Sequence, residues 1–426
     1  MNLRSQTAIV LLATLLAAHV AQAAPAEFAE QEIRAASKST GIASPRVTFA
    51  VDPALGGQAY RFDRSADGAI KVVAGDDIGA MYGGLDVAEA LRLGTLDSIV
   101  SDSRVHSPYI VNRGLKFNVP LDFRTPTYSD RATASQANIP EMWSTDFWHA
   151  FLDEMARDRY DLLSLWSLHP FPSLVKVPEF PDVALDDVWQ GKPDADGHYR
   201  HGEVVKKISI DEKIVFWRDV MSYAHERGIR IYIFTWNVFT AGATGKYGIT
   251  DAMDNPATIA YTRASVRELV KTYPLLAGLG ITAGEHMPDA SDEAKENWLW
   301  ATYGEGVRDA LGEKPSRVFQ MIHRFHQTSF SAIMRHWTDF PGPFAFSFKY
   351  SIAHMYSITN PPMVKPALAL LPPRTKMWLT VRNDDIYTFR FGDPDYNSAD
   401  STWARMVTVP VANFSIAIRN PARVSS

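Results

Sequence analysis

The stretch LAGLGITAGEHM, residues 276–287, carries the clearest evidence of the fold of this chain. An unbroken apolar run, residues 276–281, is followed by a polar tip that contains Glu285 and His286. A strand of a parallel barrel is buried on both faces, and the chemistry of such barrels lies just beyond the carboxyl ends of the strands. We therefore expect a barrel strand that presents Glu285 as a proton donor. The alternative is that Glu285 caps the next helix or forms an ion pair.

Apolar runs of this kind alternate along the chain with amphipathic stretches, which predicts an α/β fold with a TIM-type (β/α)8 barrel. The expected strands are residues 109–119, 160–166, 230–236, 276–282, 317–322, 344–348 and 377–381, with a weaker eighth at 411–418. The segments with apolar residues at helical spacing, which belong on the outside of the barrel, include 146–158, 211–228 and 258–273. Because the chain ends soon after the eighth run, we expect either a minimal C-terminus or an incomplete barrel with exposed edges on its first and seventh strands.

The first 23 residues have the features of an export signal. Arg4 is followed by an apolar run, residues 8–18, and by the small-x-small pattern of residues 21–23. Cleavage before Ala24 takes the net charge from −5 to −6, which argues against a nucleic-acid partner, and no other stretch predicts a membrane span. The chain contains no cysteine, so disulfides are excluded. A periplasmic or secreted protein is expected; its oligomeric state is not indicated.

Residues 24–107 predict a small α+β domain that precedes a barrel domain at 108–426. Short alternating runs in this region are followed by a helical pattern that Asp76 or Asp77 opens. The glycines of residues 75–84 lack the GxGxxG spacing of a dinucleotide site. We therefore interpret them as positions where a helix packs closely on a sheet.

The N-terminal half contains a predicted strand, then the helical segment GDDIGAMYGGLDVAEAL (residues 75–91), then the strand segment RGLKFNV (residues 113–119). This order of elements resembles the N-terminal architecture of exported glycoside hydrolases, notably α-glucuronidases and β-hexosaminidases. The resemblance implies a small domain followed by a TIM barrel, with the acid Glu at the end of barrel strand four, which is Glu285 here. In β-hexosaminidases that Glu follows an Asp that orients the acetamido group of the substrate. Gly284 takes this place here, which favours a mechanism with two enzyme carboxylates.

Glycoside hydrolysis requires a second carboxylate as nucleophile or base. Asp384 and Asp385 follow the seventh predicted strand, so one of them is the expected partner of Glu285. The alternative is an ordinary turn, because Asn-Asp-Asp is also turn chemistry. Asp122, after the first strand, is a reserve choice.

Polar residues that follow the other predicted strands would line the same end of the barrel. The predicted substrate-binding residues are Arg124, His169, Asn237, His286, His323, Lys349, Tyr350, His354 and Arg382. The basic residues of this set, together with Arg324, predict a positively charged barrel opening suited to the carboxylate of a uronic acid. Alternatively, these bases pair with acids inside the site.

His323 and His326 have an HxxH spacing that could bind a divalent ion, but the sequence lacks HExxH and cysteine ligands. Hydrogen bonding to sugar hydroxyls is favoured, and no metal or cofactor is expected. The sequence thus predicts an α-glucuronidase-like hydrolase acting on O-glycosidic bonds of a plant or algal polysaccharide or oligosaccharide. The alternatives are a hydrolase of N-acetylated or neutral sugars and a catalytically inactive carbohydrate-binding protein.

Overall fold

The computed structural model describes residues 25–127, 133–284, 286–287, 289–349, 369, 376–381 and 414–419. They form two compact units. The first contains the described residues up to Val111 together with Leu152–Arg159 and Tyr223–Ile229, and the second contains the remainder. The predicted division into domains 24–107 and 108–426 stays a prediction. Within the described part of the chain, no helix combines the length and apolar character needed to cross a bilayer.

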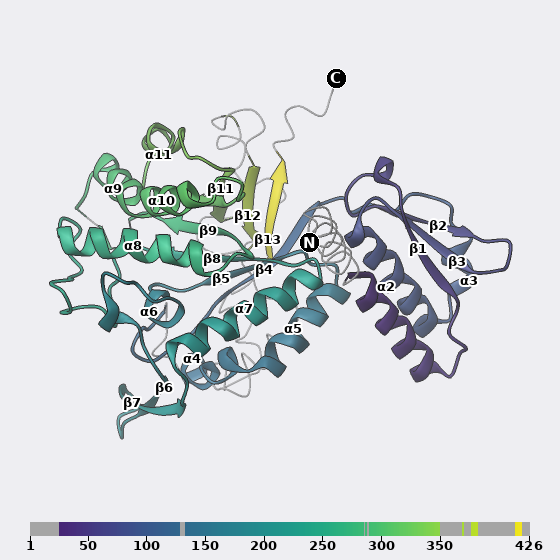
Figure 1. Ribbon diagram of the computed structural model, residues 1–426, viewed down its shortest axis with the longest axis horizontal. Helices are drawn as coiled ribbons and strands as arrows, with labels where there is room; N and C mark the ends of the chain where they lie inside the picture. Colours follow the sequence, from purple (N-terminus) through teal and green to yellow (C-terminus); the bar gives the residue numbers. More distant parts are fainter. Residues whose placement is uncertain are drawn as a thin grey trace, which may run out of the picture. The chain divides into compact units, whose positions relative to one another are not determined.

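The first unit contains a three-stranded sheet and helices (Figure 1). The strand order is β1-β3-β2, in which β3 pairs parallel with β1 and antiparallel with β2. Residues 25–40 are helical. The other elements of the sheet and its helices are β1 (Val47–Val51), η1 (Pro53–Leu55), β2 (Tyr60–Arg64), β3 (Ile70–Ala74), α2 (Asp77–Leu93) and α3 (Leu96–Val100).

Helix α2 begins after Asp76, whose side chain accepts a hydrogen bond from the Gly79 N–H at 2.7 Å. Its glycines lie directly on the sheet: a Cβ at Gly79 would be 2.3 Å from the Ala59 carbonyl oxygen, and one at Gly83 would be 2.5 Å from Val72 Cγ1. The glycines of this segment are therefore close-packing positions, as interpreted from the sequence.

The second unit is built around a curled sheet of parallel strands, consistent with a TIM-type barrel that is incomplete as a set of eight parallel strands. Neighbouring strands pair in the order β4, β5, β8, β9, β10, β11, β12, all of them parallel. Their bounds are β4 (Asn112–Asn118), β5 (Leu162–Trp166), β8 (Arg230–Trp236), β9 (Leu276–Thr282), β10 (Gln320–Arg324), β11 (Phe344–Lys349) and β12 (Lys376–Val381).

An eighth strand, β13 (Phe414–Arg419), lies where a weak strand was expected, but it runs in the opposite direction. It pairs antiparallel with both β12 and β4 and closes the ring of strands. The edges of the first and seventh strands are thus covered rather than exposed. An antiparallel strand does not need the helical crossover that a parallel strand requires, so the direction of β13 departs from the all-parallel pattern of a (β/α)8 barrel.

Glycines of β9 make room for the aromatic rings that fill the barrel. A Cβ at Gly280 would lie 2.0 Å from Phe234 Cδ1, and one at Gly278 would lie 3.0 Å from Tyr232 Cδ1. The Phe234 ring in turn stacks on Trp166, with 4.3 Å between the ring centroids. Side chains of alternate residues in neighbouring strands therefore fill the interior as a packed core.

Amphipathic helices surround the strands, and those predicted at 146–158, 211–228 and 258–273 are all present (Figure 1). Helix α8 packs against α10 and against a π-helical turn, η4, that joins α9 to α10. The described helices after β4 are α4 (Thr133–Asn138), α5 (Thr145–Arg157), α6 (Phe171–Leu174), α7 (Ile210–Glu226), α8 (Pro256–Thr272), α9 (Asp292–Leu299), η4 (Trp300–Gly304), α10 (Glu305–Glu313) and α11 (Phe330–Trp337). The C-terminal parts of α5 and α7 belong to the first unit.

A hairpin that was not predicted interrupts the barrel between β5 and α7. Its strands, β6 (Val188–Pro193) and β7 (Tyr199–Lys206), pair antiparallel. Short 3-10 turns, η2 (Glu141–Trp143) and η3 (Pro181–Val183), complete the described elements of this region. The Asp-Gly turn between two extended runs was the available signal for a hairpin.

The packing of β9 predicts that Gly280→Ala destabilises the protein by about 2 kcal/mol or more, because its methyl group would displace the Phe234 ring from a filled interior. Urea unfolding would measure this change. Gly312→Ala, in α10, is the matched control: nothing lies within 4 Å of its added Cβ, so the same substitution should leave stability unchanged or raise it by up to about 1 kcal/mol. Equal free energies of unfolding for the Gly280→Ala variant and wild type would contradict this account of the barrel interior.

Candidate functional site

A row of residues crosses five neighbouring barrel strands near their carboxyl ends. Strand register aligns Trp236 with Thr282, Thr282 with Arg324, and Arg324 with Ser347, which in turn aligns with Trp378. All five side chains are buried. Three of the five, Thr282, Arg324 and Ser347, are polar, whereas earlier inward positions on β8 and β9 hold aromatic residues and glycine. The interior therefore becomes partly polar at this row. A TIM-type barrel places its chemistry at this end.

Several side chains at this end, among them Asn237 and Thr282, have buried polar atoms without a hydrogen-bond partner among the described residues. Asn237 follows β8 and is 1% exposed, yet neither its Oδ1 nor its Nδ2 is paired. Thr282, the last residue of β9, is also 1% exposed, and its Oγ1 is unpaired. Asn118, at the end of β4, adds an unpaired Oδ1. Because an unsatisfied buried polar group costs about 1–3 kcal/mol, such a cluster marks a place where a ligand or water completes the hydrogen bonds.

Two cations lie over the Trp166 ring at the same end of the barrel. Lys116 Nζ, from β4, is 4.6 Å from the ring centroid, and Arg324 Cζ, from β10, is 5.8 Å from it. Trp166 also meets Trp236 edge-on, with 4.9 Å between ring centroids. The interior of the barrel therefore carries positive charge next to aromatic faces.

Several predicted site residues lie outside the described residues. They are the three predicted catalytic carboxylates, Glu285, Asp384 and Asp385, and the predicted ligands Tyr350, His354 and Arg382. For Lys349 only the backbone position, at the end of β11, is described. Their roles stay predictions.

Arg124 is engaged with partners inside the protein. Its Nε and Nη2 donate to the two carboxylate oxygens of Asp122, each at 2.8 Å, and Nη2 also donates to the carbonyl oxygens of Asp186 and Asp187. Asp122 is buried and further accepts the Trp189 N–H at 3.1 Å. This network joins the loop after β4 to the β6–β7 hairpin, which agrees with the alternative that a predicted base pairs with an acid of the protein.

His169 is buried, and both ring nitrogens face protein groups. Nδ1 lies 2.7 Å from the Ala241 carbonyl oxygen, and Nε2 lies 3.1 Å from the Tyr261 hydroxyl. Burial lowers the pKa of His169 to about 4, although the hydrogen bond to Ala241 acts to raise it. The ring is therefore neutral at physiological pH, with Nδ1 as donor and Nε2 as acceptor.

His323 faces away from the barrel interior toward a glutamate that sequence reasoning missed. Its Nε2 lies 3.0 Å from Glu296 Oε2, which also accepts the Trp337 Nε1–H at 2.9 Å. All three side chains are buried. Burial acts to raise the pKa of Glu296, but His323 and the hydrogen bonds to the carboxylate outweigh it, so this pKa lies below its ordinary value. Glu296 shares a helix face with buried Leu299, and that spacing was the signal available in the sequence.

His286 is exposed, and its ring meets Phe239 edge-on, with 4.2 Å between the ring centroids. Asn237 and His286 follow the neighbouring strands β8 and β9, so the fold brings these two predicted ligands to the same end of the barrel. His169 and His323 lie near the same strand ends but contact protein groups.

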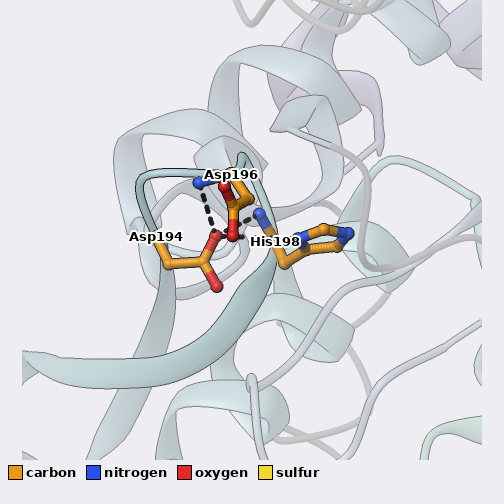
Figure 2. Close-up of side chains that lie close together, drawn as sticks. All are labelled: Asp194, Asp196 and His198. Carbon is orange, nitrogen blue, oxygen red and sulfur yellow. Dashed lines mark hydrogen bonds and ion pairs between the residues drawn. The ribbon is translucent and has the colours of Figure 1, made fainter.

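Among the described residues, one group of three has the spacing of metal ligands: Asp194, Asp196 and His198, at the tip of the β6–β7 hairpin (Figure 2). Asp194 Oδ1 accepts the backbone N–H groups of Asp196 and His198 at 3.0 and 2.8 Å, which is how an Asp stabilises a tight turn. Asp194 Oδ2 also lies 3.4 Å from Arg200 Nη1. Turn formation and ion pairing account for this group.

No family model matches the chain, and no curated protein matches its sequence. Among solved structures it is similar to a GH138 enzyme targeting pectin rhamnogalacturonan II, with 19% identity and a TM-score of 0.64 over 82% of this chain and 39% of the other. The chain thus spans about two fifths of that enzyme. An exo-β-N-acetylglucosaminidase of family GH20 from Vibrio harveyi has 13% identity and a TM-score of 0.44 over 76% of this chain and 56% of its own. The GH20 β-N-acetylhexosaminidase of Streptomyces coelicolor A3(2) has 12% identity and a TM-score of 0.44 over 77% of this chain and 60% of its own. Only the first likeness is close enough to indicate a shared fold, and at its identity it indicates the fold alone.

Replacement of Glu296 tests the buried cluster. Glu296→Leu leaves the Trp337 Nε1–H and the His323 ring without their acceptor, so we expect a loss of about 3 kcal/mol or more in the free energy of unfolding. Glu293→Leu, three residues earlier on α9, removes half-exposed pairs with Arg335 and His336 and should cost about 1 kcal/mol or less. Urea unfolding measures both, and equal losses would refute the assignment of Glu296 to the core.

The environment of His169 predicts acid sensitivity. Its pKa is about 4 in the folded protein and about 6.5 when unfolded, so the stability it provides is complete above about pH 6.5 and is lost as the pH falls toward 4. In His169→Asn the side-chain amide can still donate to the Ala241 carbonyl oxygen but does not titrate. We expect wild-type stability, measured by urea unfolding at pH 7, 5.5 and 4, to fall more steeply than that of the variant. Parallel curves would rule out this contribution.

Proposed function

We propose that the protein is a glycoside hydrolase that acts on O-glycosidic bonds of a plant or algal polysaccharide or oligosaccharide containing a uronic acid. The observation that carries this proposal is the set of buried polar atoms of Asn237 and Thr282 that have no partner among the described residues and lie beside aromatic rings at the carboxyl end of a barrel. Hydroxyl groups of a sugar both donate and accept hydrogen bonds, and aromatic rings suit the apolar faces of sugar rings. The fold shared with an enzyme that targets a pectin supports the same substrate class.

In the proposed reaction Glu285 is the general acid. Its protonated carboxyl gives a proton to the glycosidic oxygen as the bond from that oxygen to the anomeric carbon breaks. Asp384 or Asp385 either attacks the anomeric carbon or removes a proton from the water that attacks it. The separation of the two carboxylates decides between retention and inversion of configuration.

The uronic-acid preference is supported by the two cations near Trp166. Lys116 and Arg324 lie on the inner face of the barrel, beside the Trp166 ring. A substrate carboxylate bound near these two cations would gain charge-assisted hydrogen bonds. We further propose that the protein is exported through its N-terminal signal, acts in the periplasm or outside the cell, and requires no cofactor.

A substrate panel tests the acid assignment. The mature protein is assayed for sugar release from glucuronosyl, galacturonosyl, xylosyl and N-acetylglucosaminyl substrates beside Glu285→Gln, which cannot donate the proton. We expect turnover of a uronosyl substrate and a loss of at least about 100-fold in kcat for the variant, with folding verified by circular dichroism. Turnover only of N-acetylated or neutral sugars would overturn the substrate class. Glycan binding without turnover would favour a carbohydrate-binding protein, and equal activity of the two proteins would remove Glu285 as the acid.

Asn237→Ala tests the site itself. Since the Asn237 amide has no partner among the described residues, its loss should change the free energy of unfolding by no more than about 1 kcal/mol while lowering kcat/KM by about 10- to 100-fold. Asn297→Ala, at an exposed position of α9, is the control and should alter neither quantity appreciably. If Asn237→Ala unfolds easily and remains as active as wild type per folded molecule, the amide serves the fold rather than a ligand.

A further inference from the structure

The loops that follow the neighbouring strands β9 and β10 touch where Gly284 meets Gln327. Gly284 lies two residues beyond β9 and has a φ of +99°, in the range that favours glycine. A Cβ at Gly284 would lie 2.4 Å from Gln327 Cβ and 2.8 Å from Gln327 Oε1. Both the backbone and the space at this position therefore require glycine, and Gln327 occupies the space that a side chain at 284 would take.

Gln327 itself holds an unfavourable backbone conformation. Its φ is +52°, which residues other than glycine adopt at a cost of about 1–3 kcal/mol. Its carbonyl oxygen accepts a hydrogen bond from Nζ of Lys295, a buried residue of α9, at 2.8 Å. The conformation is thus fixed from two sides, by Lys295 and by Gly284. Backbone strain that the surroundings hold in place is typical of functional positions.

The side chain placed in this way is exposed and polar. Gln327 lies three residues beyond β10, whose last residue, Arg324, is aligned with Thr282 of β9. Its amide makes no hydrogen bond with the other described residues. A primary amide offers one carbonyl acceptor and two N–H donors from a single planar group, which suits adjacent hydroxyl groups of a pyranose.

We propose that Gln327 is a specificity-determining residue whose side-chain amide hydrogen-bonds adjacent hydroxyl groups of the bound sugar at the carboxyl end of the barrel. The inference rests on the proposed glycoside-binding function. Gly284 and Lys295 act as positioning residues, because they hold the Gln327 backbone without reaching the sugar themselves. A glycine would form the same turn with less strain, so the turn itself does not require the Gln327 side chain.

Gln327→Gly separates the two roles, because it relieves the backbone strain and removes the amide together. We expect an unfolding temperature equal to or above that of wild type and a fall of at least 10-fold in kcat/KM for the sugar that wild type cleaves. Affinity for the released sugar, measured by calorimetry, should fall by a similar factor. Gln58→Gly is the matched control: Gln58 belongs to the first unit and also has a positive φ, +62°, so its replacement should leave kcat/KM and affinity unchanged.

Monodeoxy analogues of the cleaved sugar identify the contact. The analogue that lacks the contacted hydroxyl should bind wild type at least 10-fold more weakly than the parent sugar, whereas Gln327→Gly should bind both with equal affinity. If Gln327→Gly matches wild type in kcat/KM and affinity, the inference is overturned while the proposed function stands. If wild type neither cleaves nor binds any sugar of the panel, the proposed function fails and this inference fails with it.

Discussion

The barrel depends on the absence of side chains along the inner face of β9. A Cβ at Gly280 would lie 2.0 Å from the Phe234 ring, and one at Gly278 would lie 2.3 Å from the Gln320 carbonyl oxygen and 3.0 Å from the Tyr232 ring. The Phe234 ring then supports Trp166, and further aromatic residues extend this stacked core across the interior. Burying large aromatic rings supplies much of the apolar area of such a core, so a strand of small residues has to face them. The hydrogen-bonded register of β8 and β9 brings these small residues level with the aromatic side chains of β8.

The alternation of inward and outward side chains along each strand also determines where the apolar core ends. Since side chains of a strand repeat every two residues, the inward face that holds Gly278 and Gly280 continues to Thr282. The strand register aligns Thr282 with Arg324 of β10, and Arg324 with Ser347 of β11. The apolar side chains of the interior are therefore followed by polar ones at the same position on three adjacent strands. A one-residue slip of β9 would turn Thr282 outward and point an apolar side chain into the polar layer. The register of β9 that packs the core thus also determines where the polar end of the barrel lies.

This coupling explains which parts of the fold could be read from the sequence. Strands at residues 230–236 and 276–282 were predicted with their observed bounds, because a strand that is buried on both faces is a nearly continuous run of apolar residues in the sequence. The last strand was located near residues 411–418, but its direction was missed, since apolar content is the same for a parallel and an antiparallel strand. The β6–β7 hairpin was overlooked because half of its residues are exposed and the alternation is weak.

Site residues are harder to predict, because a polar residue at a strand end can be satisfied from elsewhere in the chain. The partner of Arg124, Asp122, is two residues away, whereas the partner of His323, Glu296, lies on a separate helix, and neither pairing follows from residue type or spacing. What distinguishes Asn237 from these residues is the cost of its burial. An ion pair recovers part of its desolvation within the fold, whereas neither polar atom of the buried Asn237 amide is paired within the described part of the chain. Among the described residues Asn237 therefore has the environment expected of a residue whose hydrogen bonds a bound ligand or water completes.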